Sequence, residues 1–127
     1  MRGALRRIGL AVLVLALAGC VAAGGPDGEA CAQPSVHLAL ALDEDGLHPG
    51  SAAACRDQEV HLSVESALEG VLHIHGYDSE VPAFEVRADE TAEVSFTAGR
   101  SGQFPVEFHA ADDPRGVGMG VLTIHEP

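Results

Sequence analysis

Two histidines separated by a single residue, His73 and His75, are the strongest candidates for chemistry in this sequence. On a β-strand, residues i and i+2 face the same side with their Cα atoms about 6.6 Å apart, so two imidazoles placed in this way can converge on one metal ion. Imidazole is a good ligand for copper, zinc and nickel. The pair therefore indicates a metal site, although isolated histidines at this spacing are also typical of solvated or hydrogen-bonded surface positions.

Two more side chains could complete such a site. His109 ends an alternating stretch that begins at Phe104, and Met119 lies between two glycines just before the last expected strand. A thioether is a soft ligand that favours copper. Each residue also has a simpler interpretation, because His109 is close to Asp112 and Asp113 in an expected surface loop, and methionine commonly fills gaps in a core. The other histidines have no companion at ligand spacing and are interpreted as surface residues: His37, His48, His61 and His125.

The elements that must position these side chains are predicted to be strands. Apolar residues recur with a period of two through residues 35–127, no stretch carries a convincing helical stripe, and Gly, Pro and Asp mark the turns. This alternation is typical of strands that bury one face against a second sheet. The sequence thus predicts a single all-β domain over 35–127, an antiparallel β-sandwich or barrel. The expected strands are 36–42, 60–64, 71–75, 84–86, 92–97, 104–109 and 121–124.

The order of these features resembles the cupredoxin family over most of the expected domain. Three segments carry the resemblance, namely 73–78, 102–109 and 119–124. They are similar to the segment that supplies the first histidine ligand, to the strand that leads into the ligand loop, and to the end of that loop with the final strand. The resemblance implies a Greek-key antiparallel β-sandwich with a metal site at one end. In it, His75 corresponds to the first ligand and Met119 to the weak axial ligand.

One departure from the family changes the expected chemistry. A blue-copper site requires a cysteine thiolate in the ligand loop. No cysteine follows Cys55 in this chain, and the corresponding place is taken by Phe108 or His109. The electron-transfer function of the family is therefore not implied. What is left is a non-enzymatic, thiolate-free site for copper or zinc, whose expected ligands are His73, His75, His109 and Met119.

A metal-free alternative stays open. The same sandwich could serve as an interaction or accessory module of the cell envelope, because one fold hosts many functions. Three imidazoles able to reach one ion at metal–nitrogen distances of about 2.0–2.1 Å would favour the metal site. The sequence contains no motif for nucleophilic catalysis and no phosphate-binding glycine loop.

The first residues predict where the protein acts. Basic residues precede an apolar run, and residues 1–19 end in Leu-Ala-Gly directly before Cys20. This arrangement is typical of a secretory signal and resembles the lipobox of bacterial lipoproteins. An apolar run of about 11 residues is too short for a membrane span, which requires roughly 20. The protein is therefore expected to be exported and anchored to the cell membrane by lipid on Cys20, on the periplasmic or extracellular face.

The rest of the chain fits an exported domain. Residues 20–34 are expected to form the lipidated cysteine and a flexible tether, because their first part is rich in Ala and Gly and has no apolar periodicity. Cys31 and Cys55 are expected to form a disulfide in an oxidising compartment, with a thiol metal site as the alternative. The formal net charge is −12 and lysine is absent, so the surface repels nucleic acid. The expected partners are the membrane, through Cys20, and an envelope protein.

Overall fold

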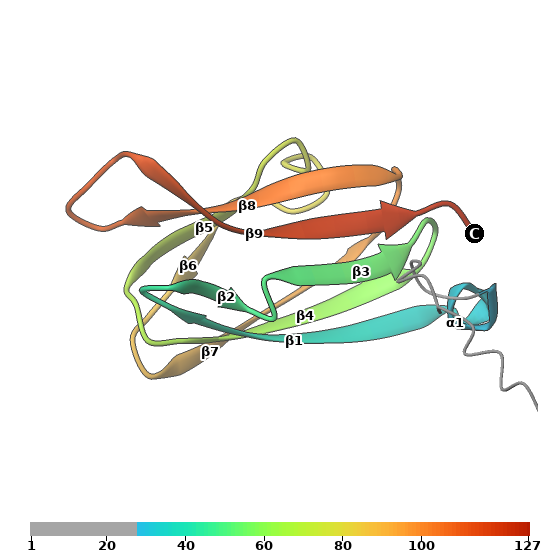
Figure 1. Ribbon diagram of the computed structural model, residues 1–127, viewed down its shortest axis with the longest axis horizontal. Coiled ribbons are helices and arrows are strands. Elements are labelled where there is room, and N and C mark those ends of the chain that lie inside the picture. Colours follow the sequence, from blue (N-terminus) through green and yellow to red (C-terminus); the bar gives the residue numbers. More distant parts are fainter. Residues whose placement is uncertain (1–27) are drawn as a thin grey trace, which may run out of the picture.

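Two β-sheets pack face to face in the computed structural model, which describes residues 28–127 (Figure 1). The expected all-β sandwich is thereby confirmed. The signal segment 1–19 and Cys20 lie outside the described residues. The elements of the described part are α1 (Gly28–Ala32), β1 (Ser35–Asp43), β2 (Gly46–His48), β3 (Ser51–Cys55), β4 (Glu59–Ser66), β5 (Gly70–Ile74), β6 (Phe84–Val86), β7 (Glu90–Thr97), β8 (Gly102–Ala110) and β9 (Gly116–His125).

The two sheets are mixed rather than purely antiparallel. The four-stranded sheet has the order β2-β1-β4-β7, and the five-stranded sheet has the order β3-β9-β8-β5-β6. β1 runs parallel to β4, and β3 runs parallel to β9, whereas the other pairs are antiparallel. The expectation of an antiparallel sandwich is wrong for those two pairs. The reason is that the chain crosses to the second sheet as β3 and returns as β4, so that β4 lies beside β1 in the same direction.

The core lies between the sheets because apolar residues alternate along the longer strands. In β4, Val60, Leu62 and Val64 are buried, and in β8 Phe104 and Phe108 face the same interior. Burying a side chain of this size stabilises the fold by about 1.5–3 kcal/mol. The residues of opposite phase consequently point away from the core, and those of β5 and β8 carry the candidate ligands.

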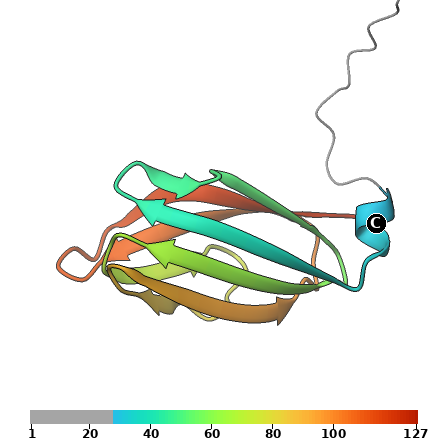
Figure 2. The same cartoon turned by 90° about the horizontal axis from the view of Figure 1, so that it is seen from below.

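The disulfide expected between Cys31 and Cys55 is present, with 5.4 Å between the Cα atoms. It attaches α1 to the end of β3, at the same end of the sandwich as the C-terminus (Figures 1 and 2). The side-chain amide of Gln58 adds two hydrogen bonds of 2.9 Å, to the carbonyls of Ala30 and Gln33. The expectation of a flexible tether is therefore wrong for residues 28–34, which these contacts hold against the domain.

Two strands were not expected from the sequence. β2 lies in a Gly- and Pro-rich stretch, and β3 has the sequence Ser-Ala-Ala-Ala-Cys, which lacks alternation between apolar and polar residues. β3 forms a strand because it pairs with β9, which is distant in the sequence, so the local pattern does not predict it. Within residues 28–127, no helix has the length and apolar character needed to cross a membrane.

Candidate metal centre

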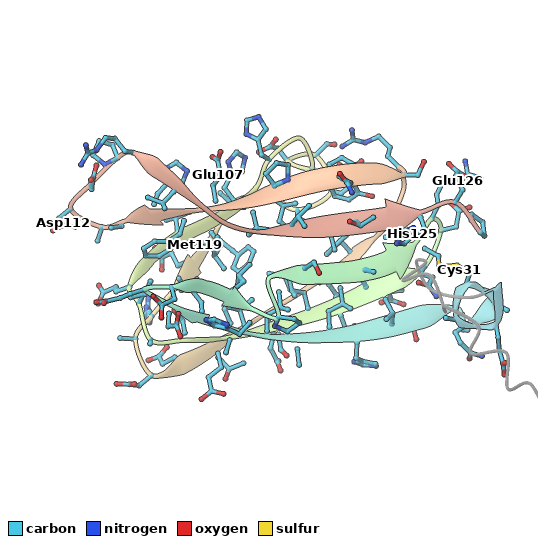
Figure 3. The ribbon with its side chains drawn as sticks, in the orientation of Figure 1. Cys31, Glu107, Asp112, Met119, His125 and Glu126 are labelled. Atoms are coloured by element: carbon cyan, nitrogen blue, oxygen red, sulfur yellow. A yellow bond between two sulfur atoms is a disulfide. The ribbon has the colours of Figure 1, made fainter. Side chains whose placement is uncertain are left out.

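The candidate ligands lie on the outer face of the five-stranded sheet. β5 and β8 are antiparallel neighbours, and their register places His73 opposite Glu107 and Val71 opposite His109. Leu72, Ile74 and Phe108 of the same strands point into the core. His73, Glu107 and His109 therefore project together from the other face of the sheet, with His75 one residue beyond the end of β5. Glu107 points outward from β8 in Figure 3.

The distances between these side chains suit a shared ion. One ligand atom from each of His73, His75 and Glu107 lies within 4.8 Å of the other two. Oε2 of Glu107 is 4.0 Å from Nδ1 of His73 and 3.8 Å from Nε2 of His109. The ring centre of His73 is 5.6 Å from that of His75 and 6.2 Å from that of His109. The ring of His73 thus lies near those of His75 and His109, and the carboxylate of Glu107 lies near both His73 and His109, whereas His109 is outside the group whose ligand atoms all lie within 4.8 Å of one another.

In His73 and His109, the ring nitrogen that is not the one near Glu107 is already hydrogen-bonded. Nε2 of His73 contacts the carboxylate of Asp78, which when ionised can only accept, so His73 donates there, and in the neutral ring the lone pair is on Nδ1, 4.0 Å from Oε2 of Glu107. Nδ1 of His109 donates to the carbonyl of Pro114 at 3.1 Å, which in the neutral ring places the lone pair on Nε2. Metal-binding histidines typically donate their second N–H to a carboxylate or a carbonyl in this way.

Asp78 is suited to this supporting role. The hydrogen bond from His73 lowers the pKa of Asp78 below its usual value, which keeps the carboxylate ionised as an acceptor. The side chain of Asp78 is more than half exposed, at 59%. The side chain of His73 is only 23% exposed. The more exposed Asp78 therefore orients a candidate ligand that is itself mostly buried.

The turn that delivers Asp78 is fixed by Tyr77. This residue is fully buried, and its ring lies edge-on to that of Phe104 with 4.5 Å between centroids. Gly76 precedes it with φ of 82°, a left-handed conformation that suits glycine. The guanidinium of Arg100 lies 4.9 Å from the centre of the Tyr77 ring and donates to the Gly76 carbonyl. These contacts place Asp78 beside His73.

Glycine residues in β9 leave room for the candidate ligands on β8. Gly116 is the register partner of His109. A Cβ atom added at Gly116 would lie 2.9 Å from Cε1 of His109, closer than real Cβ atoms approach, and 3.0 Å from Oε2 of Glu107, which is tighter than most real contacts. At Gly118 an added Cβ would meet nothing within 4 Å. Glycine at position 116 thus holds open the space that the two side chains occupy.

Met119 does not join this group. It packs against the hydrophobic core, and Figure 3 shows it between the two sheets while Glu107 lies on the outer side. The register between β8 and β9 shifts between Val106 and Glu107, and Met119 lies in the extra position of β9. The expected position of the site also differs, since the group lies on a sheet face instead of at one end of the sandwich.

Sequence reasoning missed Glu107 and Asp78. Glu107 shares the outward phase of His109, so its direction could be read from the alternation, but its proximity to His73 depends on which strands pair. The interpretation of His37 and His61 as histidines without a companion is also wrong, because they are register partners on β1 and β4.

No family model matches the chain, and no curated protein matches it. Solved structures do match. A multicopper oxidase, mgLAC, is 18% identical over 71% of this chain and 38% of its own, with a TM-score of 0.55. Auracyanin from Roseiflexus castenholzii is 14% identical over 72% of this chain and 98% of its own, with a TM-score of 0.51. The metal-binding domain of the Cu(I)-exporting P-type ATPase CopA from Streptococcus pneumoniae D39 is 15% identical over 69% and 83%, with a TM-score of 0.50.

The chain has a cupredoxin-like fold. At these identities the likeness establishes the fold, and the ligands must be judged from the residues of this chain. Residues 28–127 offer no thiolate for a blue-copper centre, because both cysteines of this part of the chain, Cys31 and Cys55, are joined in the disulfide. Their imidazole and carboxylate donors fit Cu(II) or Zn(II) instead.

Proposed function

We propose that this cupredoxin-like protein binds one Cu(II) or Zn(II) ion through His73, His75, His109 and Glu107, without blue-copper electron transfer. The observation that carries the proposal is the spacing within 4.8 Å of ligand atoms from His73, His75 and Glu107. Binding at metal–ligand distances of about 2.0–2.2 Å then requires these side chains to rotate toward one common point.

The surroundings of the group support a role in holding or passing on metal. His73 and His109 are oriented by the carboxylate of Asp78 and the carbonyl of Pro114, which fixes their ligand nitrogens before an ion arrives. His75 is exposed, so an ion can enter and leave from solvent on that side. A surface that is strongly acidic, with a net charge of −12, attracts cations.

The decisive experiment is calorimetric titration of the purified protein, prepared without a histidine tag, with Cu(II) and Zn(II). His75→Ala and Glu107→Gln are each expected to weaken binding by about tenfold or more, because each removes a ligand atom. His48→Ala is the matched control, since His48 is an exposed histidine that is paired with Asp43 on the other sheet. Unchanged heats in both His75→Ala and Glu107→Gln would remove the proposed site and leave a metal-free interaction module.

We further propose that the protein is exported and lipid-anchored through Cys20. The support is the sequence Leu-Ala-Gly-Cys at 17–20, after a basic and then apolar start. Cells fed radioactive palmitate should label the wild-type protein and not a Cys20→Ser variant. Equal labelling of both proteins would contradict the anchor without bearing on the metal site.

A further inference from the structure

A second pair of histidines lies on the outer face of the four-stranded sheet, on the opposite side of the sandwich from the first group. β1 and β4 are parallel, and their register sets His37 directly beside His61. The two rings are stacked, with 4.7 Å between centroids and 20° between planes. At His61, β4 is paired with β1 on one side and with β7 on the other, whereas at His37 β1 is paired with β4.

The ring of His61 is oriented by polar neighbours. Its Nδ1 is hydrogen-bonded to the hydroxyl of Ser95 on β7 at 2.9 Å. Its Nε2 is therefore the nitrogen left for other partners, and it lies 3.7 Å from Oε1 of Glu59, two residues earlier on β4. His61 is about one-third exposed, at 35%, whereas His37 is exposed. The arrangement thus brings together the oriented Nε2 of His61, the imidazole of His37 stacked on the His61 ring, and the carboxylate of Glu59.

The surface beside the pair is hollowed. A depression of about 320 Å³ is lined by both histidines together with Ser63, Glu93 and Ser95. Ser63 and Glu93 are register partners on β4 and β7, one pleat further along the sheet than His61 and Ser95. The depression is therefore lined by side-chain oxygen atoms as well as by the two imidazoles.

We propose that His37 and His61, with Glu59, form a second binding site for a divalent transition metal such as Cu(II), Zn(II) or Ni(II). Imidazole nitrogens are good ligands for these ions, and a carboxylate neutralises part of the charge. A rigid pair of neighbouring strands reduces the entropy lost when both rings bind one ion. The site shares no residue with the group of His73, His75, His109 and Glu107, and it goes beyond the function proposed above.

The test is a count of Cu(II) ions bound by the full chain, purified in detergent without a histidine tag. Titration is followed by the electron paramagnetic resonance of Cu(II), whose hyperfine pattern reports coordinated nitrogen. The double variant His73→Ala/His75→Ala disables the first site. It is expected to keep one nitrogen-coordinated Cu(II), and adding His37→Ala or His61→Ala should weaken that binding by about tenfold or more. His48→Ala in the same background is the matched control.

The outcomes for the two sites are separable. No nitrogen-coordinated Cu(II) in the double variant, or bound Cu(II) that neither His37→Ala nor His61→Ala weakens, overturns the second site and leaves the first untouched. Loss of Cu(II) only on changing His37 or His61 supports the second site and removes the first. Because His37 is exposed, its truncation leaves the core intact, and a thermal unfolding curve for each variant verifies that the fold is kept.

Discussion

The hydroxyl of Tyr77 is hydrogen-bonded to both backbone groups of Arg100: it accepts from the N–H at 3.1 Å and donates to the carbonyl at 3.2 Å. Arg100 lies just before β8, and Tyr77 lies in the turn after β5. The two bonds therefore join the turn that follows β5 to the segment that leads into β8, and these two strands position the candidate ligands. The buried phenol fixes the turn in which Asp78 reaches His73.

Removing that hydroxyl should destabilise the domain. Tyr77→Phe leaves two backbone groups of Arg100 without their partner, and we expect a loss of about 1–3 kcal/mol in the free energy of unfolding. Urea unfolding followed by circular dichroism measures the change. Thr97→Val, on the exposed face of β7, is the control and should change stability by at most about 0.5 kcal/mol. Equal stability of the two variants would contradict the structural role given to Tyr77.

Replacement of Gly116 should damage the first metal site without unfolding the domain. In Gly116→Ala the new methyl group meets His109 and Glu107 at about 3 Å, so these side chains must move. We expect Cu(II) affinity to fall by roughly tenfold or more, since the ligand geometry is lost. Gly118→Ala is the matched control on the same strand, where the added Cβ atom meets nothing within 4 Å. Equal affinities for both variants in calorimetric titration would argue against Glu107 and His109 as ligands.

Asp78 should affect metal affinity more than stability. Asp78→Asn keeps the size of the side chain but removes the charge that accepts from His73, and outer partners of this kind typically contribute roughly 10–100-fold in affinity. Asp112→Asn, in the turn between β8 and β9, is the control because Asp112 is an exposed aspartate. An affinity for Zn(II) that is unchanged in Asp78→Asn would show that His73 needs no such support.

Acid should weaken the domain through Glu80. Its hydrogen bond from Arg100, aided by one from Ser79, lowers the pKa of Glu80 to about 2 from 4.5. A carboxyl whose pKa is lower in the folded state contributes stability above its unfolded value, and this contribution is lost as the pH falls toward the folded value. We expect Glu80→Gln to reduce the acid-induced loss between pH 4.5 and about 2. Urea midpoints measured across that range test this, with Glu44→Gln as the control. Parallel curves for wild type and Glu80→Gln would be the contrary result.

The disulfide should hold α1 on the domain. Cys31→Ser opens a loop that closes 24 positions of sequence, and the chain-entropy model gives a loss of about 3 kcal/mol. Hydrogen exchange should also become faster in residues 28–34. Reduction of the wild-type protein under native conditions supplies an independent comparison. Unaltered exchange in this segment after both treatments would mean that the bonds of Gln58 hold it without the disulfide.

Local patterns predicted those strands whose two faces differ in polarity. β4 and β8 alternate strictly between buried apolar and outward residues, and both were expected from the sequence. β3 was not, because its three alanines pack on a neighbour without showing an alternation. Its identity as a strand depends on β9, which is distant in the chain, and no local rule contains that information.

The residues of the candidate site were likewise predictable only where the signal was local in the sequence. The spacing of His73 and His75 was a local signal, and a strand geometry turns it into a pair of neighbouring ligands. Glu107 was missed because its contact with His73 is set by the register of β5 against β8. Met119 was expected as a ligand from its place in the chain, but its side chain packs against the core.

The pairing of β3 with β9 also determines when this domain can be completed. Ser51 is the register partner of Val121, and Cys55 is the partner of His125. As an edge strand, β3 has β9 as its one neighbour in the sheet, so it stays unpaired while β9 is still being synthesised. Contacts between segments so far apart in sequence form slowly, because a long loop must close first. A ribosome-bound chain that stops before β9 should consequently be sensitive to proteases, and the sandwich should be completed only after β9 has been synthesised.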